Sequence, residues 1–166
     1  MNWKDLTIGI EEEYQIIDPE SRELTSYISE ILDQGAVVFR DQVKPEFLQS
    51  QVETGSHICR NIKEARQEVK RLRTIVNDIA RRNNRRIVAA GTHPFSRWED
   101  QVITDKERYK TLLKDMHLIA QRLLIFGMHV HIGIKDPDIR IDVMNQLRYF
   151  APHIMALSTS SPFWFG

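Results

Sequence analysis

The sequence predicts an α+β domain in which helices pack on one face of a largely antiparallel sheet. Three observations favour this class. Several segments alternate apolar and polar side chains with the period of two that is typical of half-buried strands. Three longer segments carry apolar residues at helical spacing. Turn signals rich in Pro, Gly, Asp and Ser separate these segments. The polar sides of the strands are unusual for a solvated surface, so we expect the open polar face of the sheet to form the active site.

The segment 126–134 has the most regular alternation. One side carries Phe126, Met128, Val130, Ile132 and Ile134, and the other carries Gly127, His129, His131 and Gly133. Two imidazoles at positions i and i+2 of one strand face can share a metal ion or a phosphate, and the glycines leave room for it to approach. A pair of ordinary surface histidines is the alternative when this strand is taken alone.

A second strand, over 7–16, has the same design. Its apolar side carries Ile8, Ile10, Tyr14 and Ile16, and its polar side carries Gly9, Glu11, Glu13 and Gln15. Glutamate is a poor strand former, and carboxylates two residues apart on one face repel each other unless a cation lies between them. One strand therefore offers carboxylates and another offers imidazoles, which together predict a metal-lined pocket on the sheet.

A third polar strand is expected over 48–55. Leu48 and Val52 face one way, whereas Gln49, Gln51 and Glu53 face the other. Glu46 has the opposite parity, so it joins the polar face only if the backbone turns or bulges near Phe47.

The other elements follow from their caps and breakers. Helices are expected over 25–34, from Asn61 to about residue 86, from the Thr104/Glu107 capping box to residue 123, and from Asp136-Pro137 onward, with Pro152 starting a further short helical stretch. Short strands are expected over 36–40 and 87–90. The buried stripe of the long helix is expected to be Ile62, Ala65, Val69, Leu72, Val76 and Ile79.

Composition limits the classes of function. Residues 1–166 are expected to form a single domain, because a chain of this length can enclose a sizeable core. Lys plus Arg and Asp plus Glu each number 23, so no net charge points to nucleic acid or membrane. The long helix is locally basic but lacks aromatic residues, which favours a solvated helix face. The single cysteine, Cys59, and the absence of an apolar run of signal-peptide or membrane-spanning length favour the cytoplasm.

The motif content narrows the chemistry. The chain has no Gly-rich phosphate loop, no dinucleotide fingerprint, no cysteine cluster for structural zinc and no Gly-x-Ser-x-Gly elbow. Several glutamates with one or two histidines suit Mg²⁺ or Mn²⁺ better than zinc. A carboxylate-rich metal cluster neutralises polyphosphate, which allows a protein without a phosphate loop to hold a nucleotide.

Six segments in a fixed order give the chain a family resemblance. They are Gly9-Ile10-Glu11-Glu12-Glu13-Tyr14-Gln15, Val52-Glu53-Thr54, Ala89-Ala90-Gly91-Thr92-His93-Pro94-Phe95, Thr104-Asp105-Lys106 with Arg108-Tyr109, Met128-His129-Val130-His131, and Leu157-Ser158 with Ser160-Ser161-Pro162-Phe163-Trp164. With these segments the chain resembles, from Ile8 to Gly166, the carboxylate–amine ligases of the glutamate–cysteine ligase type 2 group, which are relatives of glutamine synthetase.

The resemblance implies an incomplete glutamine synthetase-like catalytic domain and an ATP-dependent amide synthesis. ATP would phosphorylate the γ-carboxylate of glutamate or a similar acid. The amine of cysteine or a similar amino acid would then displace phosphate from the acyl phosphate, so that ADP and phosphate are released. The implied cofactors are ATP and Mg²⁺ or Mn²⁺, and the implied partners are small amino acids.

The resemblance also implies roles for individual residues. Glu11, Glu13 and Glu53 would be metal ligands, His129 a ligand or phosphate contact, and His131 a contact of the nucleotide phosphates or the acyl phosphate, with Glu46 as a further metal ligand from its spacing to Glu53. For Glu12, on the opposite face, a structural salt bridge is expected. Thr92 and His93 lie near the substrate or serve a turn.

The aromatic end of the chain carries one further expectation. Phe163, Trp164 and Phe165 are apolar where termini are normally polar. The family continues beyond this point into strands that complete the sheet and supply further acidic ligands and an arginine. We therefore expect an N-terminal half of the enzyme that forms homo-oligomers. The alternative is a truncated, non-catalytic metal- or nucleotide-binding or assembly module.

Overall fold

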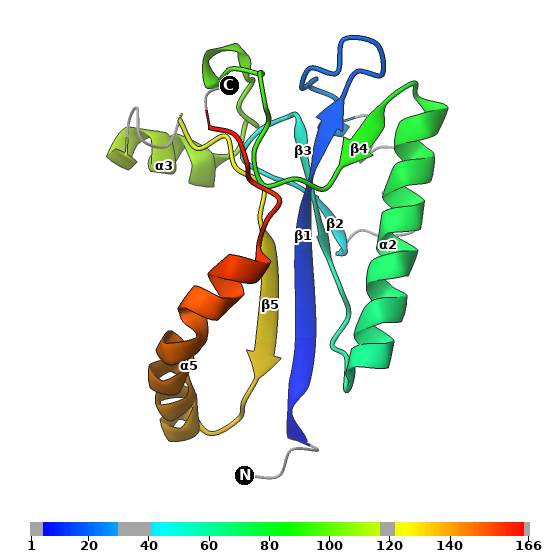
Figure 1. Cartoon of the computed structure of the whole chain (residues 1–166). Coiled ribbons are helices and arrows are strands. Elements are labelled where there is room, and N and C mark those ends of the chain that lie inside the picture. The colour runs from blue at the N-terminus through cyan, green and yellow to red at the C-terminus, as the bar shows by residue number, and fades with distance from the viewer. Residues whose placement is uncertain (1–4, 30–40, 117–121, 165–166) are drawn as a thin grey trace.

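A computed structural model describes residues 5–29, 41–116 and 122–164. Five antiparallel strands form one sheet, with β1 at its centre (Figure 1). The strands are β1 (Thr7–Ile17), β2 (Val43–Pro45), β3 (Gln51–Gly55), β4 (Arg86–Val88) and β5 (Met128–Gly133). β3 pairs with one edge of β1 and is followed outward by β2, whereas β4 and β5 share the other edge of β1. The predicted fold class, an α+β domain with a largely antiparallel sheet, is confirmed.

Helix α2 (Ile62–Arg82) packs against β1 and β4 on the apolar face of the sheet (Figure 1). The core that it closes consists of Tyr14, Ile16, Ile28, Val43, Val52 and Val76. Asn61 caps the helix as predicted, because its Oδ1 accepts hydrogen bonds from the backbone of Lys63 and Glu64. The prediction that Ile62 is buried is wrong: its side chain is 69% exposed, because it lines an open hollow with Ile10 and Met128 rather than a closed core.

Helix α3 (Glu107–Met116) packs at a second, smaller core rather than on the centre of the sheet. Tyr109 lies edge-on against Phe47, with a ring separation of 5.5 Å. Thr104 does not cap this helix as predicted, because its hydroxyl donates instead to the carbonyl oxygen of Glu46 at 2.6 Å. Residues 117–121 of the predicted helix lie outside the described residues. A short 3₁₀ turn, η2 (Trp98–Asp100), precedes α3.

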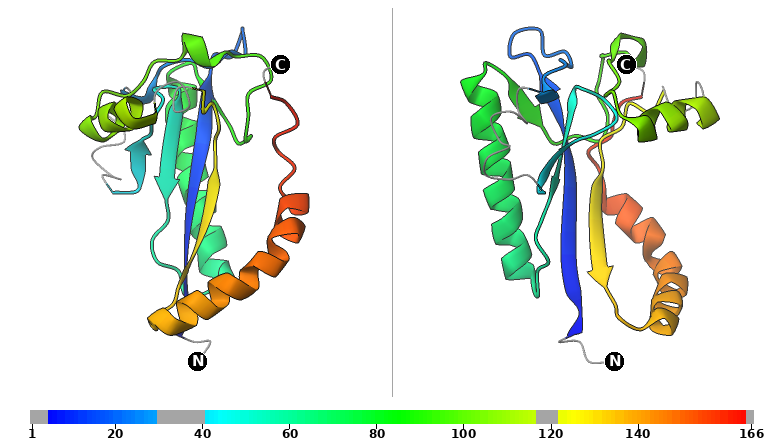
Figure 2. Two further views of the ribbon diagram at one scale, coloured as in Figure 1. Left: turned by 90° about the vertical axis from the view of Figure 1, so that its left-hand side faces the viewer. Right: turned by 180° about the vertical axis from the view of Figure 1, so that it is seen from behind.

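Helix α5 (Pro137–Leu157) begins as predicted, with Asp136 as its cap and proline at its start. It is one continuous helix, so the prediction that Pro152 starts a separate stretch is wrong. An internal proline removes a single backbone donor, and a helix of this length can continue past it. Figure 2 shows α5 standing away from the sheet.

The observed bounds of several other elements differ from the predicted ones. The predicted strand over 48–55 begins only at Gln51, because residues 49–50 form a turn. That turn lets Leu48 bridge to Ile103 instead. β2 was not predicted, since three residues are too few to show an alternation. The strand expected over 36–40 lies outside the described residues, as does most of the helix expected over 25–34, of which residues 28–29 are helical.

Candidate metal site on the open sheet face

The register of the sheet gathers the predicted polar residues on the face opposite α2. Glu11 lies directly across from His129, and Gly9 lies across from His131. On the other edge of β1, Glu13 lies across from Glu53. Side chains that are directly opposite in an antiparallel pair project to the same side. Carboxylates from β1 and β3 and imidazoles from β5 therefore share one surface.

Three of these groups are in contact. His129 Nδ1 lies 3.2 Å and His131 Nε2 lies 3.0 Å from the same carboxylate oxygen, Oε2 of Glu11. The hydrogen bond with His131 is the main cause that lowers the pKa of the Glu11 carboxyl from its ordinary value; burial acts in the opposite direction, and the hydrogen bond with His129 adds a smaller lowering. Within the described residues, these three groups form the cluster whose candidate ligand atoms all lie within 4.8 Å of one another.

The spacing of this cluster fits a metal ion. Two ligand atoms held at about 2.1 Å by an octahedral ion are about 3 Å apart. Glu11 Oε2 already keeps that separation from both ring nitrogens, at 3.2 and 3.0 Å. A cation could therefore replace the shared protons without a large movement of the strands. His131, for which the family resemblance implied a phosphate contact, lies as close to Glu11 as His129 does.

Glu13 is held more rigidly than Glu11. Its Oε2 accepts a hydrogen bond of 2.7 Å from the side-chain amide of Gln51 and another of 2.7 Å from the backbone N–H of Gly127. A Cβ atom at position 127 would lie 3.3 Å from His129 Nε2 and 3.5 Å from Glu13 Oε2. The glycine therefore lets β5 and its histidine approach the carboxylate closely.

Glu53 lies in a crowded acidic environment. Burial, followed by the negative charges of Glu46 and Glu11, raises the pKa of the Glu53 carboxyl from its ordinary value, whereas Lys44 acts in the opposite direction. Lys44 is the direct cross-strand neighbour of Glu53 in the β2–β3 hairpin. Lys44 was not predicted to lie beside Glu53, because β2 is too short to display an alternation.

Glu46 follows β2 immediately, and the hairpin turn brings it near Glu53, as the predicted change of backbone direction near Phe47 required. Its carboxylate is already engaged: Arg108 Nη2 lies 3.0 Å and the Tyr109 hydroxyl 3.1 Å from Glu46 Oε2. Glu46 therefore lies beside the acidic face in an ion pair, which a metal ligand would have to share. No sequence pattern signalled the contact with Arg108, although Arg108 and Tyr109 belong to one of the family segments.

Glu12 faces the other way, as predicted. Its buried carboxylate forms a salt bridge with Arg73 of α2 and accepts a hydrogen bond from the hydroxyl of Tyr14. The expectation of a structural salt bridge is confirmed. Desolvation, followed by the hydrogen bond to Glu12, raises the pKa of Tyr14 above its ordinary range, so the phenol remains a donor.

The Thr92-His93 segment serves a turn. His93 is buried, its Nε2 lies 3.0 Å from the carbonyl oxygen of Arg22, and its Nδ1 accepts a hydrogen bond of 2.9 Å from the backbone of Ser96. Burial lowers the pKa of the His93 imidazole, so the ring is neutral in this position. Both ring nitrogens are occupied by backbone groups, which favours the turn role over substrate contact.

The comparisons with known proteins agree with this architecture. A solved glutamate–cysteine ligase from Francisella tularensis, in complex with AMP, superposes over 86% of this chain and 30% of its own with a TM-score of 0.58 at 14% identity. A bifunctional glutathione synthetase from Pasteurella multocida superposes over 90% of this chain and 19% of its own with a TM-score of 0.55 at 11% identity. At these identities the likeness concerns the fold, which is shared with ligases.

Sequence similarity defines the family. Residues 7–166 match the model of glutamate-cysteine ligase family 2 (GCS2), and the chain belongs to that family. A putative glutamate–cysteine ligase 2 from Herpetosiphon aurantiacus is 59% identical over 160 residues, and one from Roseiflexus sp. strain RS-1 is 58% identical over the same length. Both matches cover 96% of this chain but 42% of the relative, so the chain spans about two fifths of their length. Among the described residues, no helix is long and apolar enough to cross a membrane.

Proposed function

We propose that the chain carries the metal- and nucleotide-binding face of an ATP-dependent carboxylate–amine ligase that forms an amide or γ-peptide bond. The observation that carries the proposal is the convergence of Glu11, His129 and His131 at ligand spacing, beside the facing pair Glu13 and Glu53. Membership of GCS2 and the names of its relatives supply the reaction class. Residues 1–166 would be the N-terminal part of the catalytic domain.

The reaction that we propose proceeds in two steps. The γ-carboxylate of glutamate or a similar acid attacks the terminal phosphorus of ATP, which gives an acyl phosphate and ADP. The amine of cysteine or a similar amino acid then attacks the acyl carbon, loses a proton and expels phosphate. Both reactants of the first step are anions, so the barrier falls only where positive charge is held in place. Bound Mg²⁺ or Mn²⁺ would supply that charge to the nucleotide phosphates.

The protein residues would hold this arrangement. Glu11, Glu13 and Glu53 present carboxylate oxygens, the ligand type that Mg²⁺ and Mn²⁺ favour. Glu46 would contribute only by sharing its carboxylate with Arg108. Glu11 orients both imidazoles through its Oε2. His129 would serve as ligand or phosphate contact, and His131 would meet the charge that develops on the transferred phosphoryl group.

The decisive measurement is product analysis. ADP release should be assayed with the chain alone and with the chain joined to the part of the Roseiflexus relative that lies outside the match. We expect ADP and phosphate to be released by the joined protein only when a glutamate-like acid and an amino acid are both present. Release of AMP and pyrophosphate would contradict the proposal, because it indicates adenylation.

A histidine variant tests the role of the β5 face. His131→Ala in the joined protein should lower kcat by about 100-fold and change nucleotide affinity much less, if the imidazole acts mainly in the transition state. An equal loss in both quantities would mean that His131 only binds the nucleotide.

A non-catalytic metal- or nucleotide-binding or assembly module is the second candidate, and the coverage of only 42% of the curated relatives favours it for the chain in isolation. In that case the 166-residue chain binds a divalent cation or nucleotide but does not turn over. Robust ADP release by the chain alone would exclude this candidate.

We further propose that the chain forms homo-oligomers and acts in the cytoplasm. Met128, Val130 and Ile132 of β5 expose apolar side chains, as do Phe163 and Trp164. Apolar surface of this extent promotes association in water. Sedimentation should show an oligomer at micromolar concentration that Ile132→Lys weakens. A wild-type monomer under these conditions would contradict the oligomer.

A further inference from the structure

Gln51 is a buried residue on the sheet face that carries Glu11, Glu13 and Glu53. It is the first residue of β3, and its side chain is only 3% exposed. Its amide Nε2 donates to Glu13 Oε2 at 2.7 Å and lies 3.5 Å from the carbonyl oxygen of Ile125. A buried amide on a polar strand face, aimed at a carboxylate, needs an explanation beyond strand formation, since it gains little from packing.

The hydrogen bonds to Glu13 are one-sided. In the described chain, the amide of Gln51 and the N–H of Gly127 both end on Oε2 of Glu13. Two donors on one oxygen fix the plane of the carboxylate and leave Oε1 available to another partner. Glu13 also faces Glu53 directly across β1 and β3. Glu13 therefore lies on the same sheet face as Glu11, beside the cluster that Glu11 forms with His129 and His131 but outside it.

The neighbouring residue Gln15 provides an internal comparison. Gln15 lies directly across from Gln51, on the same face and equally buried at 1% exposure. Its amide donates to the carbonyl oxygens of Ala90 and Thr92, each at 3.1 Å. Gln15 thus ties β1 to the segment after β4, whereas Gln51 ties β3 to a carboxylate of the candidate metal site.

We propose that Gln51 is a positioning residue for the metal site: together with the Gly127 N–H it orients Glu13, so that Oε1 of Glu13 is presented to a divalent cation. Groups that hold a ligating carboxylate in place commonly change metal affinity by about 10–100-fold when they are removed. This inference rests on the proposed metal site and goes beyond it, because it assigns a function to a residue that does not itself bind the ion.

The test is a Mn²⁺ titration of the 166-residue chain, followed by electron paramagnetic resonance of free Mn²⁺. Gln51→Met keeps the length of the side chain and removes its donor, and we expect it to weaken Mn²⁺ binding by at least about tenfold. Gln51→Asn keeps a buried amide but withdraws it from Glu13, and should weaken binding to a similar extent. Gln15→Met is the matched control, which should lower the melting temperature and leave Mn²⁺ affinity unchanged.

A double-variant cycle separates positioning from direct ligation or general destabilisation. In a Glu13→Gln background, Glu11, His129 and His131 remain, and the further change Gln51→Met should have no added effect on Mn²⁺ affinity. A persisting effect would overturn the positioning role. Equal losses for the Gln51 and Gln15 variants would also overturn it, since both would then act through stability. Unchanged affinity in both Gln51 variants refutes this inference alone, whereas a wild-type chain that binds no Mn²⁺ refutes the metal site as well.

Discussion

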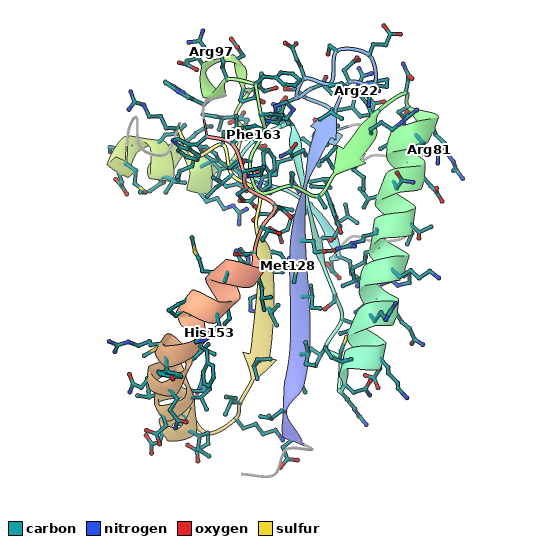
Figure 3. The ribbon with its side chains drawn as sticks, in the orientation of Figure 1. Arg22, Arg81, Arg97, Met128, His153 and Phe163 are labelled. Carbon is teal, nitrogen blue, oxygen red and sulfur yellow. The ribbon has the colours of Figure 1, made fainter. Side chains whose placement is uncertain are left out.

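The two ends of the sheet present the same sequence pattern in opposite surroundings. On the α2 side, Ile16 of β1 is fully buried in a core that the helix closes. On β5, Ile132 has the same parity but is 51% exposed, and α5 has no extensive packing against any other described helix or strand. Figure 3 places the labelled His153 on α5, away from α2, whereas Met128 of β5 lines an open hollow with Val69 of α2. Alternation therefore fixes which way a side chain points but not what covers it.

The difference matters for the candidate site. Glu11 and Glu13 sit on the strand that α2 stabilises, whereas His129 and His131 sit on a strand that is held mainly by its pairing with β1. The carboxylates of β1 are thus carried by a strand whose apolar side is buried under α2, whereas the imidazoles of β5 are carried by a strand whose apolar side is exposed. Four predictions sharpen or break this contrast.

The largest effect is expected from a matched pair of core deletions. Ile16→Ala should lower the free energy of unfolding by about 2–5 kcal/mol, because it leaves a cavity under α2. Ile132→Ala should cost less than about 1 kcal/mol, since half of that side chain is already in water. Urea denaturation checks both values at a dilution at which sedimentation shows a monomer. Equal costs under these conditions would mean that β5 is covered by another part of its own chain.

A smaller effect on stability is expected at Glu68 of α2, whose carboxylate contacts Arg71 of the same helix and Gln42 just before β2. Glu68 pairs with Arg71 at 2.8 Å and accepts a hydrogen bond of 3.2 Å from Gln42, and the hydrogen bond with Arg71 is the main cause that lowers the pKa of Glu68 to about 2. A carboxyl whose pKa falls on folding stabilises the protein above its unfolded pKa, and this contribution is lost as pH falls toward 2.

Glu68→Gln should therefore cost about 1 kcal/mol at pH 7, allowing for the partial exposure of the pair. The cost should shrink steadily below about pH 4.5. Thermal melts of both proteins across that range provide the measurement, with Asp142→Asn on the exposed α5 as the control. A cost that does not change with pH would show that the charge of Glu68 is not the stabilising element.

The acidic face should respond in the opposite direction. Glu13 and Glu53 are direct cross-strand neighbours, and like charges in that relation are destabilising. Without metal, Glu53→Gln should raise stability by about 0.5 kcal/mol, and with Mn²⁺ it should remove most of the metal-induced gain. Melting temperatures with and without Mn²⁺ check this reversal. A variant that melts lower than wild type in chelator would mean that Glu53 is structurally required.

The smallest effect is expected at the turn that holds His93. Burial lowers the pKa of this imidazole, so the folded state binds its proton more weakly than the unfolded chain does. The contribution of His93 is then complete above the ordinary histidine pKa of about 6.5 and declines as pH falls below it. His93→Gln should flatten the dependence of the melting temperature between about pH 5 and 7. An unchanged slope would assign that dependence to another group.

The sequence predicted the sheet and the side chains that share its polar face, because the alternation of a strand can be read residue by residue. These side chains are Glu11, Glu13, Glu53, His129 and His131. It could not predict that His131 and His129 share one oxygen of Glu11, since that depends on strand register. The wrong prediction for Ile62 has a similar origin: helical periodicity shows which side of α2 faces the sheet, but not whether another element closes the space between them. The roles of the site residues remain predictions.

The run of three glutamates in β1 also carries information about alignment. If β1 moved by one position, Glu11 and Glu13 would enter the apolar layer and Glu12 would leave it. Only the observed register gives Arg73 of α2 a single inward carboxylate as its partner, that of Glu12. A partner-less charge in that layer would cost several kcal/mol. The salt bridge between Glu12 and Arg73 thus fixes the register of β1, and with it which carboxylates project to the opposite face of the sheet.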